Sequence, residues 1–158
     1  MANTQAMTTS FMGELLTATH NFGVAPIRAS TGVDTFKAAL YLTTATVNAS
    51  TTTYSASNEV SGTGYSAGGV AVTFGTVPTA TNSSATAGVA FVTPSASITY
   101  TTVTLATAFD AVLIYNSTQS NKAVSVHTFG SQTVTAGTFT LTMPANTTST
   151  ALIRLATT

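Results

Sequence analysis

Hydrophobic and polar residues alternate along the second half of the chain, in short runs separated by glycines. Residues 112–115 are four consecutive bulky residues, which is typical of a strand covered on both faces. In residues 138–143, Phe139, Leu141 and Met143 alternate with threonines, so one face is apolar and the other polar. This period of two residues indicates strands of an antiparallel sheet, and we expect the rest of the fold to be built around it.

Two short segments that contain glycine predict tight turns within this region. Residues 129–132 have glycine at the first central position of a two-residue loop, where a type II′ turn requires positive φ. Residues 135–138 form a second short connection of the same kind. With both turns, Val124 and Val126 share the polar face with four threonines, and the opposite face becomes the candidate core. The candidate core residues are His127, Phe129, Val134, Phe139, Leu141 and Met143.

Apolar residues near the N-terminus have the spacing of a single short helix over residues 9–22. Thr9 or Ser10 can cap its start, and Gly23 stands where a helix-ending glycine is expected. The helix either closes one end of the sheet core or reaches a neighbouring molecule, and closing the core is the simpler alternative. Its apolar positions are Phe11, Leu15, Leu16, Ala18 and Phe22.

The remainder of the chain predicts further short strands at intervals of about ten residues. We expect an all-β protein, an antiparallel β-sandwich of jelly-roll-like type with one short N-terminal helix. Residues 1–8 are read as a flexible arm and residues 9–158 as a single domain. The other predicted strands are 34–42, 70–74, 89–93, 97–101, 102–105 and 151–155, separated by a polar loop at 43–53, an ordered excursion anchored by tyrosines at 54–69, and mobile turns at 75–88.

Ionic groups are scarce, because charged residues make up 5% of the 158 residues, against roughly 25% in soluble domains. Threonine supplies hydroxyl groups in their place, and its β-branched side chain favours strands. The formal net charge is zero at pH 7, so repulsion between copies is weak and we expect a homo-oligomer that works in an assembly. Four cations give no basic patch, which argues against a nucleic-acid partner.

The chain has no cysteine, no basic and apolar leader, and no apolar run approaching the roughly 18 residues of a membrane span. The lack of cysteine argues against disulfides and thiolate metal sites. The lack of a leader argues against signal-dependent secretion. We therefore expect a protein made and folded in the cytoplasm, with no membrane partner.

Titratable residues are too few and too scattered to predict an active site. A Ser-His-Asp relay would use Asp110 and His127, but there is no nucleophile-elbow motif and the expected pairing puts His127 beside Val134 on an apolar face. Paired carboxylates for glycoside hydrolysis would have to come from four isolated acids. His20 and Glu14 are six residues apart, on different faces of the predicted helix, so no metal site is expected. We predict no enzymatic activity and no cofactor.

Four stretches together resemble small virion proteins of tailed bacteriophages. They are residues 1–11 with the short helix, residues 35–41, residues 58–69 and residues 109–116. The resemblance implies a capsid decoration or cement protein with a jelly-roll-like β fold, which lies on the outside of the capsid and binds the major capsid protein. Such a protein adds buried area across joints between capsid subunits, and repetition multiplies contacts that are individually modest.

Two other classes of function stay open. A tail-associated receptor-binding or fibre module would bind host glycans through residues 54–69 and 75–88, and it predicts exposed aromatic side chains that line a groove. An enzyme would require a pocket that joins His127 to a carboxylate. The candidate interface residues for a partner are Phe11, Leu15, Leu16, Phe22, Tyr54 and Tyr65.

Overall fold

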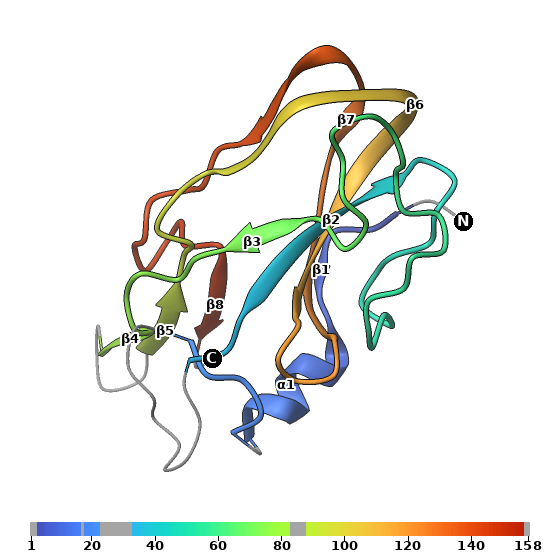
Figure 1. The fold of residues 1–158 in the computed structure, drawn as a ribbon. Coiled ribbons are helices and arrows are strands. Elements are labelled where there is room, and N and C mark those ends of the chain that lie inside the picture. Colours follow the sequence, from blue (N-terminus) through green and yellow to red (C-terminus); the bar gives the residue numbers. More distant parts are fainter. Residues whose placement is uncertain (1–2, 17, 23–32, 83–87, 157–158) are drawn as a thin grey trace.

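The computed structural model describes residues 3–16, 18–22, 33–82 and 88–156, which form one helix and eight strands (Figure 1). The helix is α1 (Thr9–Leu16), and the strands are β1 (Ala6–Met7), β2 (Phe36–Leu42), β3 (Val70–Val72), β4 (Thr79–Asn82), β5 (Gly88–Val92), β6 (Ile98–Asn116), β7 (Lys122–Leu141) and β8 (Ile153–Ala156).

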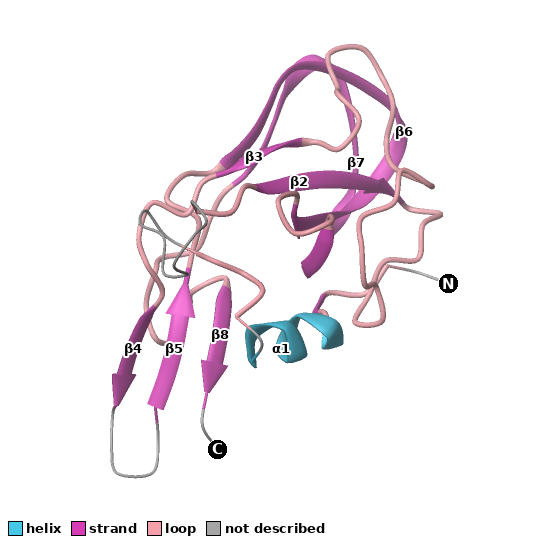
Figure 2. Ribbon diagram, turned by 60° about the horizontal axis from the view of Figure 1, so that its bottom comes forward, coloured by secondary structure: helices cyan, strands magenta, loops and turns pink. Residues whose placement is uncertain are grey.

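The strands form two antiparallel sheets. The larger sheet has the strand order β1-β7-β6-β2-β3, and the smaller sheet has the order β4-β5-β8. The smaller sheet stands at one end of the molecule, with α1 lying beside β8 (Figure 2). The prediction of an all-β antiparallel protein with one short N-terminal helix is confirmed, and the fold is compatible with a jelly roll.

Two long strands, β6 and β7, pair with each other from Ile98↔Leu141 to Asn116↔Lys122 and form a twisted ribbon that arches over the molecule (Figure 1). Both hairpins predicted within residues 129–132 and 135–138 are therefore wrong, because β7 runs through them. The two segments predicted as separate strands at 97–101 and 102–105 are likewise one strand, β6.

Residues with irregular backbone conformation cause shifts in the register of the ribbon and do not form turns. Thr102 and Ala136 have positive φ of 53° and 46°, and both lie at or beside shifts in the β6–β7 pairing. A bulge inserts an extra residue into a continuing strand and increases its twist. A glycine in the sequence therefore does not have to mark the end of a strand. Gly130 lies within β7 between the pairs Phe109↔Gln132 and Ala111↔Thr128, where the register shifts, and a Cβ added there would meet open space.

The core face predicted for β7 survives these corrections. Phe129, Val134 and Phe139 pack against the main core although each lies an odd number of residues from the next, because the register shifts between them change which positions face inward. Val124 and Val126 were predicted on the polar face, but both are fully buried. The large sheet is covered on both faces in this region, so alternation there does not separate core from solvent.

The main core lies between the large sheet and the layer formed by α1 and the small sheet. At its centre are four phenylalanines that come from α1, from the segment after it, from β2 and from the segment after β3. The Phe22 and Phe36 rings stack with centroids 4.5 Å apart, and Phe74 meets both rings edge-on. Phe11 meets Phe22 edge-on at 5.9 Å. Such pairs add about 0.5–1.5 kcal/mol each to the burial of their area.

A second, smaller core covers the opposite face of the large sheet. Here the sheet presents small residues, among them Ala39, Ala111 and Ala123, which let the loop of residues 43–59 lie close to the strands. Ala45 and Val47 from this loop complete the cluster, with Tyr54 packed against it. The predicted loop at 43–53 thus serves as a cover for the sheet.

The N-terminal residues are held on the fold. Residues 3–8 differ from the predicted arm: Ala6 and Met7 pair with β7, and Thr4 N donates a hydrogen bond to Val47 O at 3.0 Å. The helix ends at Leu16 instead of residue 22, and the chain turns at Ala18, whose φ is 53°. The turn sends the following residues back into the core, and Gly23 lies outside the described residues.

The other sequence predictions agree with the structure to within a few residues at each end. Strands predicted at 34–42, 70–74, 89–93 and 151–155 correspond to β2, β3, β5 and β8. The mobile turns predicted at 75–88 contain strand β4, which pairs with β5, while residues 83–87 lie outside the described residues.

Replacing Leu113 by Ala is expected to lower the free energy of unfolding by about 2–5 kcal/mol, since the side chain is fully buried in a strand covered on both faces. Urea denaturation followed by circular dichroism measures the change. The control is Val77→Ala, which alters a side chain that is 45% exposed and should shift stability by no more than about 0.5 kcal/mol. Equal effects of the two substitutions would contradict the packing described above.

Candidate functional site

Two of the candidate interface residues on the N-terminal segment are part of the core. Phe11 is fully buried and Phe22 is 5% exposed, so neither is available to a partner in this structure. Leu15 is half-buried and packs against the same core, and the side chain of Leu16 lies outside the described residues. The helix therefore closes the core, the simpler of the two alternatives, because turning at Ala18 brings Phe22 under it.

The two candidate tyrosines anchor the loop of residues 54–69 from within. The hydroxyls of Tyr54 and Tyr65 each donate a hydrogen bond to the Glu59 carboxylate at 2.6 Å, and Gly68 N donates a third at 2.8 Å. Glu59 is 9% exposed, so these donors replace the water that its charge would otherwise require. The expected exposed aromatic groove does not form from Tyr54 and Tyr65.

All five tyrosines of the chain have their hydroxyls engaged in hydrogen bonds. Tyr100 donates to Ala38 O and Tyr115 donates to Gly68 O, each at 2.8 Å. Tyr41 donates to Ser55 O, and burial raises the pKa of Tyr41 to about 12. Tyr41 and Tyr115 thus tie the loop of residues 54–69 to the sheet. Within the loop, Tyr54 and Tyr65 have the anchoring role that the sequence predicted for them.

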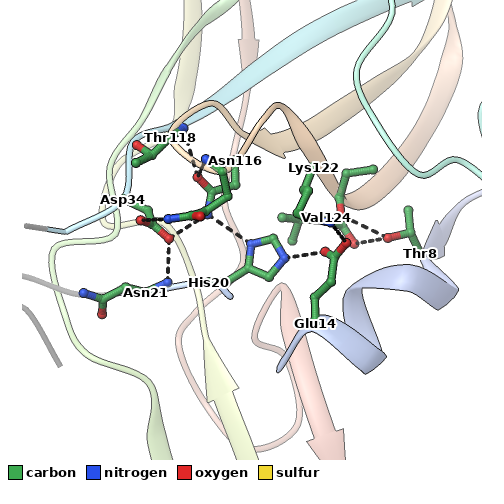
Figure 3. A network of polar contacts seen from close by, with 11 residues as sticks. Thr8, Glu14, His20, Asn21, Asp34, Asn116, Thr118, Lys122 and Val124 are labelled. Atoms are coloured by element: carbon green, nitrogen blue, oxygen red, sulfur yellow. Dashed lines mark hydrogen bonds and ion pairs between the residues drawn. The ribbon is translucent and has the colours of Figure 1, made fainter. Parts of the chain in front are cut away.

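A chain of polar contacts joins the N-terminal segment to the large sheet (Figure 3). Glu14 Oε2 lies 2.7 Å from His20 Nε2, and His20 Nδ1 lies 3.1 Å from Asn116 Nδ2 at the end of β6. Asn116 Nδ2 also donates to Asp34 Oδ2 at 2.7 Å, and Asn21 N donates to the same oxygen at 2.8 Å. We call Glu14, His20, Asn116 and Asp34 the N-terminal network.

The network corrects the expectation that Glu14 and His20 lie on different faces of one helix. The helix ends before His20, and the turn at Ala18 folds the imidazole back onto Glu14. Lys122 Nζ donates to Glu14 Oε1 at 2.6 Å from the start of β7. Burial alone would raise the pKa of Glu14, but the hydrogen bonds from Lys122 and His20 lower it below its ordinary value.

Asp34 stands just before β2 and accepts hydrogen bonds from several parts of the chain. Besides Asn21 N and Asn116, it accepts a hydrogen bond from Gln119 Nε2 at 3.0 Å, and its residue is 8% exposed. It thus links the segment after α1, the start of β2 and the turn between β6 and β7. No sequence motif predicts that these residues contact Asp34, because they are separated from one another by up to about a hundred residues.

His127 is not joined to a carboxylate. It pairs across the ribbon with Val112, not Val134, and its Nε2 lies 2.9 Å from Ser125 Oγ. Burial lowers the pKa of His127 to about 4, which keeps the imidazole neutral at pH 7. Asp110, its partner in the hypothetical relay, accepts a hydrogen bond from Asn3 Nδ2 at 2.5 Å.

A pocket of about 300 Å³ beside β1 and β8 is lined by Gln5, Met7, Ser125, His127 and Arg154, among others. A neutral imidazole with a pKa near 4 is a weak base, and a serine 2.9 Å away gains little nucleophilicity from it. The pocket's described lining includes neither Asp nor Glu. The geometry required by the enzyme hypothesis is therefore absent at His127.

Within the described ranges, no three His, Asp or Glu side chains are grouped to hold a metal ion, and no helix has the length and apolarity needed to span a membrane. Comparisons of the chain with models of protein families, with curated proteins and with solved structures found no significant match.

Charge is concentrated near the N-terminal network and the loop of residues 54–69, and long parts of the chain carry none. Residues 60–109 and 123–153 contain no Asp, Glu, Lys or Arg. These two stretches supply most of the ribbon of β6 and β7 and, in the small sheet, all of β4 and β5. The ribbon surface is thus a candidate for adhesion that does not depend on ion pairing.

Gly69→Ala is expected to destabilise the protein strongly. At Gly69, φ is +72° and an added Cβ would lie 1.6 Å from Ala38 O, so the loop would have to leave the sheet. Gly130→Ala is the matched control, because a Cβ there meets nothing within 4 Å. Thermal unfolding should show a clear fall in Tm for the first variant only, and similar Tm values for both would contradict the close approach of the loop.

His127→Gln is expected to flatten the acid side of the stability profile. The folded pKa of about 4 lies below the unfolded value of about 6.5, so the unfolded state binds the extra proton and stability is lost as the pH falls from 6.5 towards 4. The loss amounts to at most about 3 kcal/mol for this group. Urea titrations over this pH range measure it, and unchanged slopes in the variant would show that His127 is not buried as described.

Proposed function

We propose that this protein is a structural component of a tailed-bacteriophage particle, of the capsid decoration type, which binds the outside of the shell and stabilises it. The proposal joins the resemblance of four sequence stretches to small virion proteins with one observation. That observation is the uncharged outer face of the β6–β7 ribbon.

Threonine side chains dominate this outer face, while the alternate positions of both strands point into the core. Thr99 and Thr140 lie opposite each other across the ribbon, with their hydroxyl oxygens 3.4 Å apart. The exposed threonines of the ribbon are Thr99, Thr101, Thr102, Thr107, Thr133, Thr135, Thr138 and Thr140. We call this set the threonine face.

The threonine face has the physical properties that adhesion to a protein shell requires. β-Branched side chains in strands have few rotamers to lose on binding, so the entropic cost of ordering them is low. Hydroxyl groups both donate and accept hydrogen bonds and adapt to either kind of partner. Without charges, no ion has to be stripped of water at the contact.

A decoration protein also needs a scaffold that does not deform under load. The ribbon is supported from below by the aromatic core and at its side by the tyrosine-anchored loop, which bridges to β6 through Thr63↔Thr104. Many copies on a shell can then combine contacts that are each of modest area.

In the alternative, a tail-associated module binds host glycans, but two of the aromatic residues that could contact a sugar are engaged within the protein. Tyr54 and Tyr65 are committed to Glu59, and their rings stack on Tyr115 and Tyr100 with centroids 4.6 and 5.8 Å apart. The described loop surface around them thus favours an anchoring role over stacking on sugar rings.

The purified protein is expected to co-sediment in saturable amounts with phage shells prepared without it. Because the threonine face has no charge, the affinity should change little between about 0.05 and 0.5 M NaCl, where ion pairs between exposed groups become largely screened. Failure to bind the shells, or a steep loss of binding with salt, would contradict the proposal.

Thr133→Lys with Thr138→Lys is expected to weaken shell binding at least tenfold, since each lysine would have to be desolvated at the contact without a partner. The matched control, Ser57→Lys with Ser66→Lys, places the same two charges on exposed positions of the loop of residues 54–69. Equal binding by the two variants, with both folds intact by circular dichroism, would show that the threonine face is not the contact.

A further inference from the structure

The hydrogen bonds around Asn116 fix the direction of its side-chain amide. Asn116 Oδ1 accepts from the backbone N–H groups of Thr118 and Gln119, each at 3.1 Å. Its Nδ2 faces the Asp34 carboxylate at 2.7 Å, and a carboxylate can only accept. The amide nitrogen therefore donates on its other side as well, toward His20 Nδ1 at 3.1 Å.

This arrangement fixes the protonation state of His20. Because Nδ1 accepts the hydrogen bond from Asn116, the ring proton is on Nε2, which donates to Glu14 Oε2 at 2.7 Å. The imidazole side chain has no exposed surface, and it lies among the rings of Phe11, Phe22 and Phe36. His20 is thus a neutral group in an apolar setting with both nitrogens used.

A second proton on the ring would turn its Nδ1 into a donor that faces the donor Nδ2 of Asn116. The amide cannot turn over in response, since both of its ends are held by other partners. The charged groups around the imidazole are Glu14 on α1, Asp34 before β2 and Lys122 on β7. The two carboxylates favour the imidazolium, and Lys122 opposes it.

Burial outweighs the carboxylates and lowers the pKa of His20 below its ordinary value. A folded pKa below the unfolded one means that the neutral ring contributes stability above about pH 6.5, and that this contribution is lost as the pH falls below that value. The lowered pKa of Glu14 acts in the same direction at lower pH, where that carboxylate takes up its proton.

We infer that the N-terminal network is an acid-sensitive latch: protonation of His20 releases helix α1 and the segment after it from the large sheet, while the sheet itself stays folded. This inference is independent of the proposed function.

Other features of the segment make its release local. Among the described residues, the buried amide of Asn21, which is 2% exposed, has no hydrogen-bond partner for either of its polar atoms, so opening would let water satisfy both. Ala6 and Met7 keep the chain before α1 paired with β7. Of the network residues, only Asn116 belongs to the ladder between β6 and β7, in its terminal pair with Lys122.

Opening would uncover apolar surface that α1 now covers. A small apolar cavity of about 50 Å³ already lies between α1 and the small sheet, lined by Phe11, Leu15, Phe91 and Leu155, among others. Release of Phe11 and Phe22 would extend this cavity into an apolar groove over β5 and β8.

Hydrogen–deuterium exchange of the intact protein tests the latch. After correction for intrinsic exchange, the opening constant of peptides over residues 9–22 should rise by up to tenfold per pH unit below about pH 6.5, as expected for uptake of one proton. Amides at the centre of β6, residues 111–114, should stay far better protected than residues 9–22 at every pH in this range, because they exchange only through global unfolding. In His20→Gln, which keeps a donor and an acceptor but cannot titrate, the slope over residues 9–22 should vanish.

The matched control is His127→Gln, which removes the other buried histidine and should keep the slope over residues 9–22. Three results would each overturn the latch: no pH slope in the wild type, an unchanged slope in His20→Gln, or equal opening free energies for residues 9–22 and for the centre of β6. If His20→Gln does not fold, ¹⁵N spectra of the wild-type imidazole decide instead. They should show the Nε2–H form above pH 6.5 and a change of its shifts together with the exchange of residues 9–16, and an Nδ1–H form would refute the inference.

Discussion

The continuous pairing of β6 with β7 is the constraint on which the rest of the structure depends. The two strands have 19 and 20 residues, and they connect the middle of the large sheet to the arch of the ribbon. At one end, β2 and β1 flank the pair and both faces are covered; at the other, a single face rests on the aromatic core. The main covers of the large sheet are α1 and the small sheet on one side and the loop of residues 43–59 on the other.

The few charged groups of the protein are used mainly to fix these covers in place. Glu59 gathers two tyrosines and a backbone N–H under one loop, and the N-terminal network gathers α1 and the segment after it onto the ends of β2, β6 and β7. A buried carboxylate is costly unless it is fully hydrogen-bonded, so each of these groups specifies one arrangement of its cover. The ribbon, which needs no such cover on its outer face, carries hydroxyl groups instead. The buried charges therefore fix the covers, while the outer face of the ribbon carries no charge.

Local pattern was sufficient to predict the fold class and most strands, because alternation depends only on a residue's neighbours. The core-facing residues of β7 were also predicted, but through turns where the structure has register shifts. Local pattern failed at Gly130 and Gly137, where glycine suggested turns, since the choice between a turn and a continuing strand depends on a partner strand elsewhere in the chain. It failed again at His20, whose partners Glu14 and Asn116 meet it only because the helix ends early at Leu16. Phe11 and Phe22 illustrate the same limit, since an apolar helix face is equally consistent with a core and with an interface until the element beneath it is known.

Cryo-electron microscopy of the virion tests the central claim, that this is a charge-poor β scaffold adhering to a capsid, most directly. The account predicts density for repeated copies on the outer surface of the shell, with the outer face of the β6–β7 ribbon turned toward the major capsid protein. Density confined to the tail, or copies on the shell that contact it only through the charged N-terminal side, would contradict it.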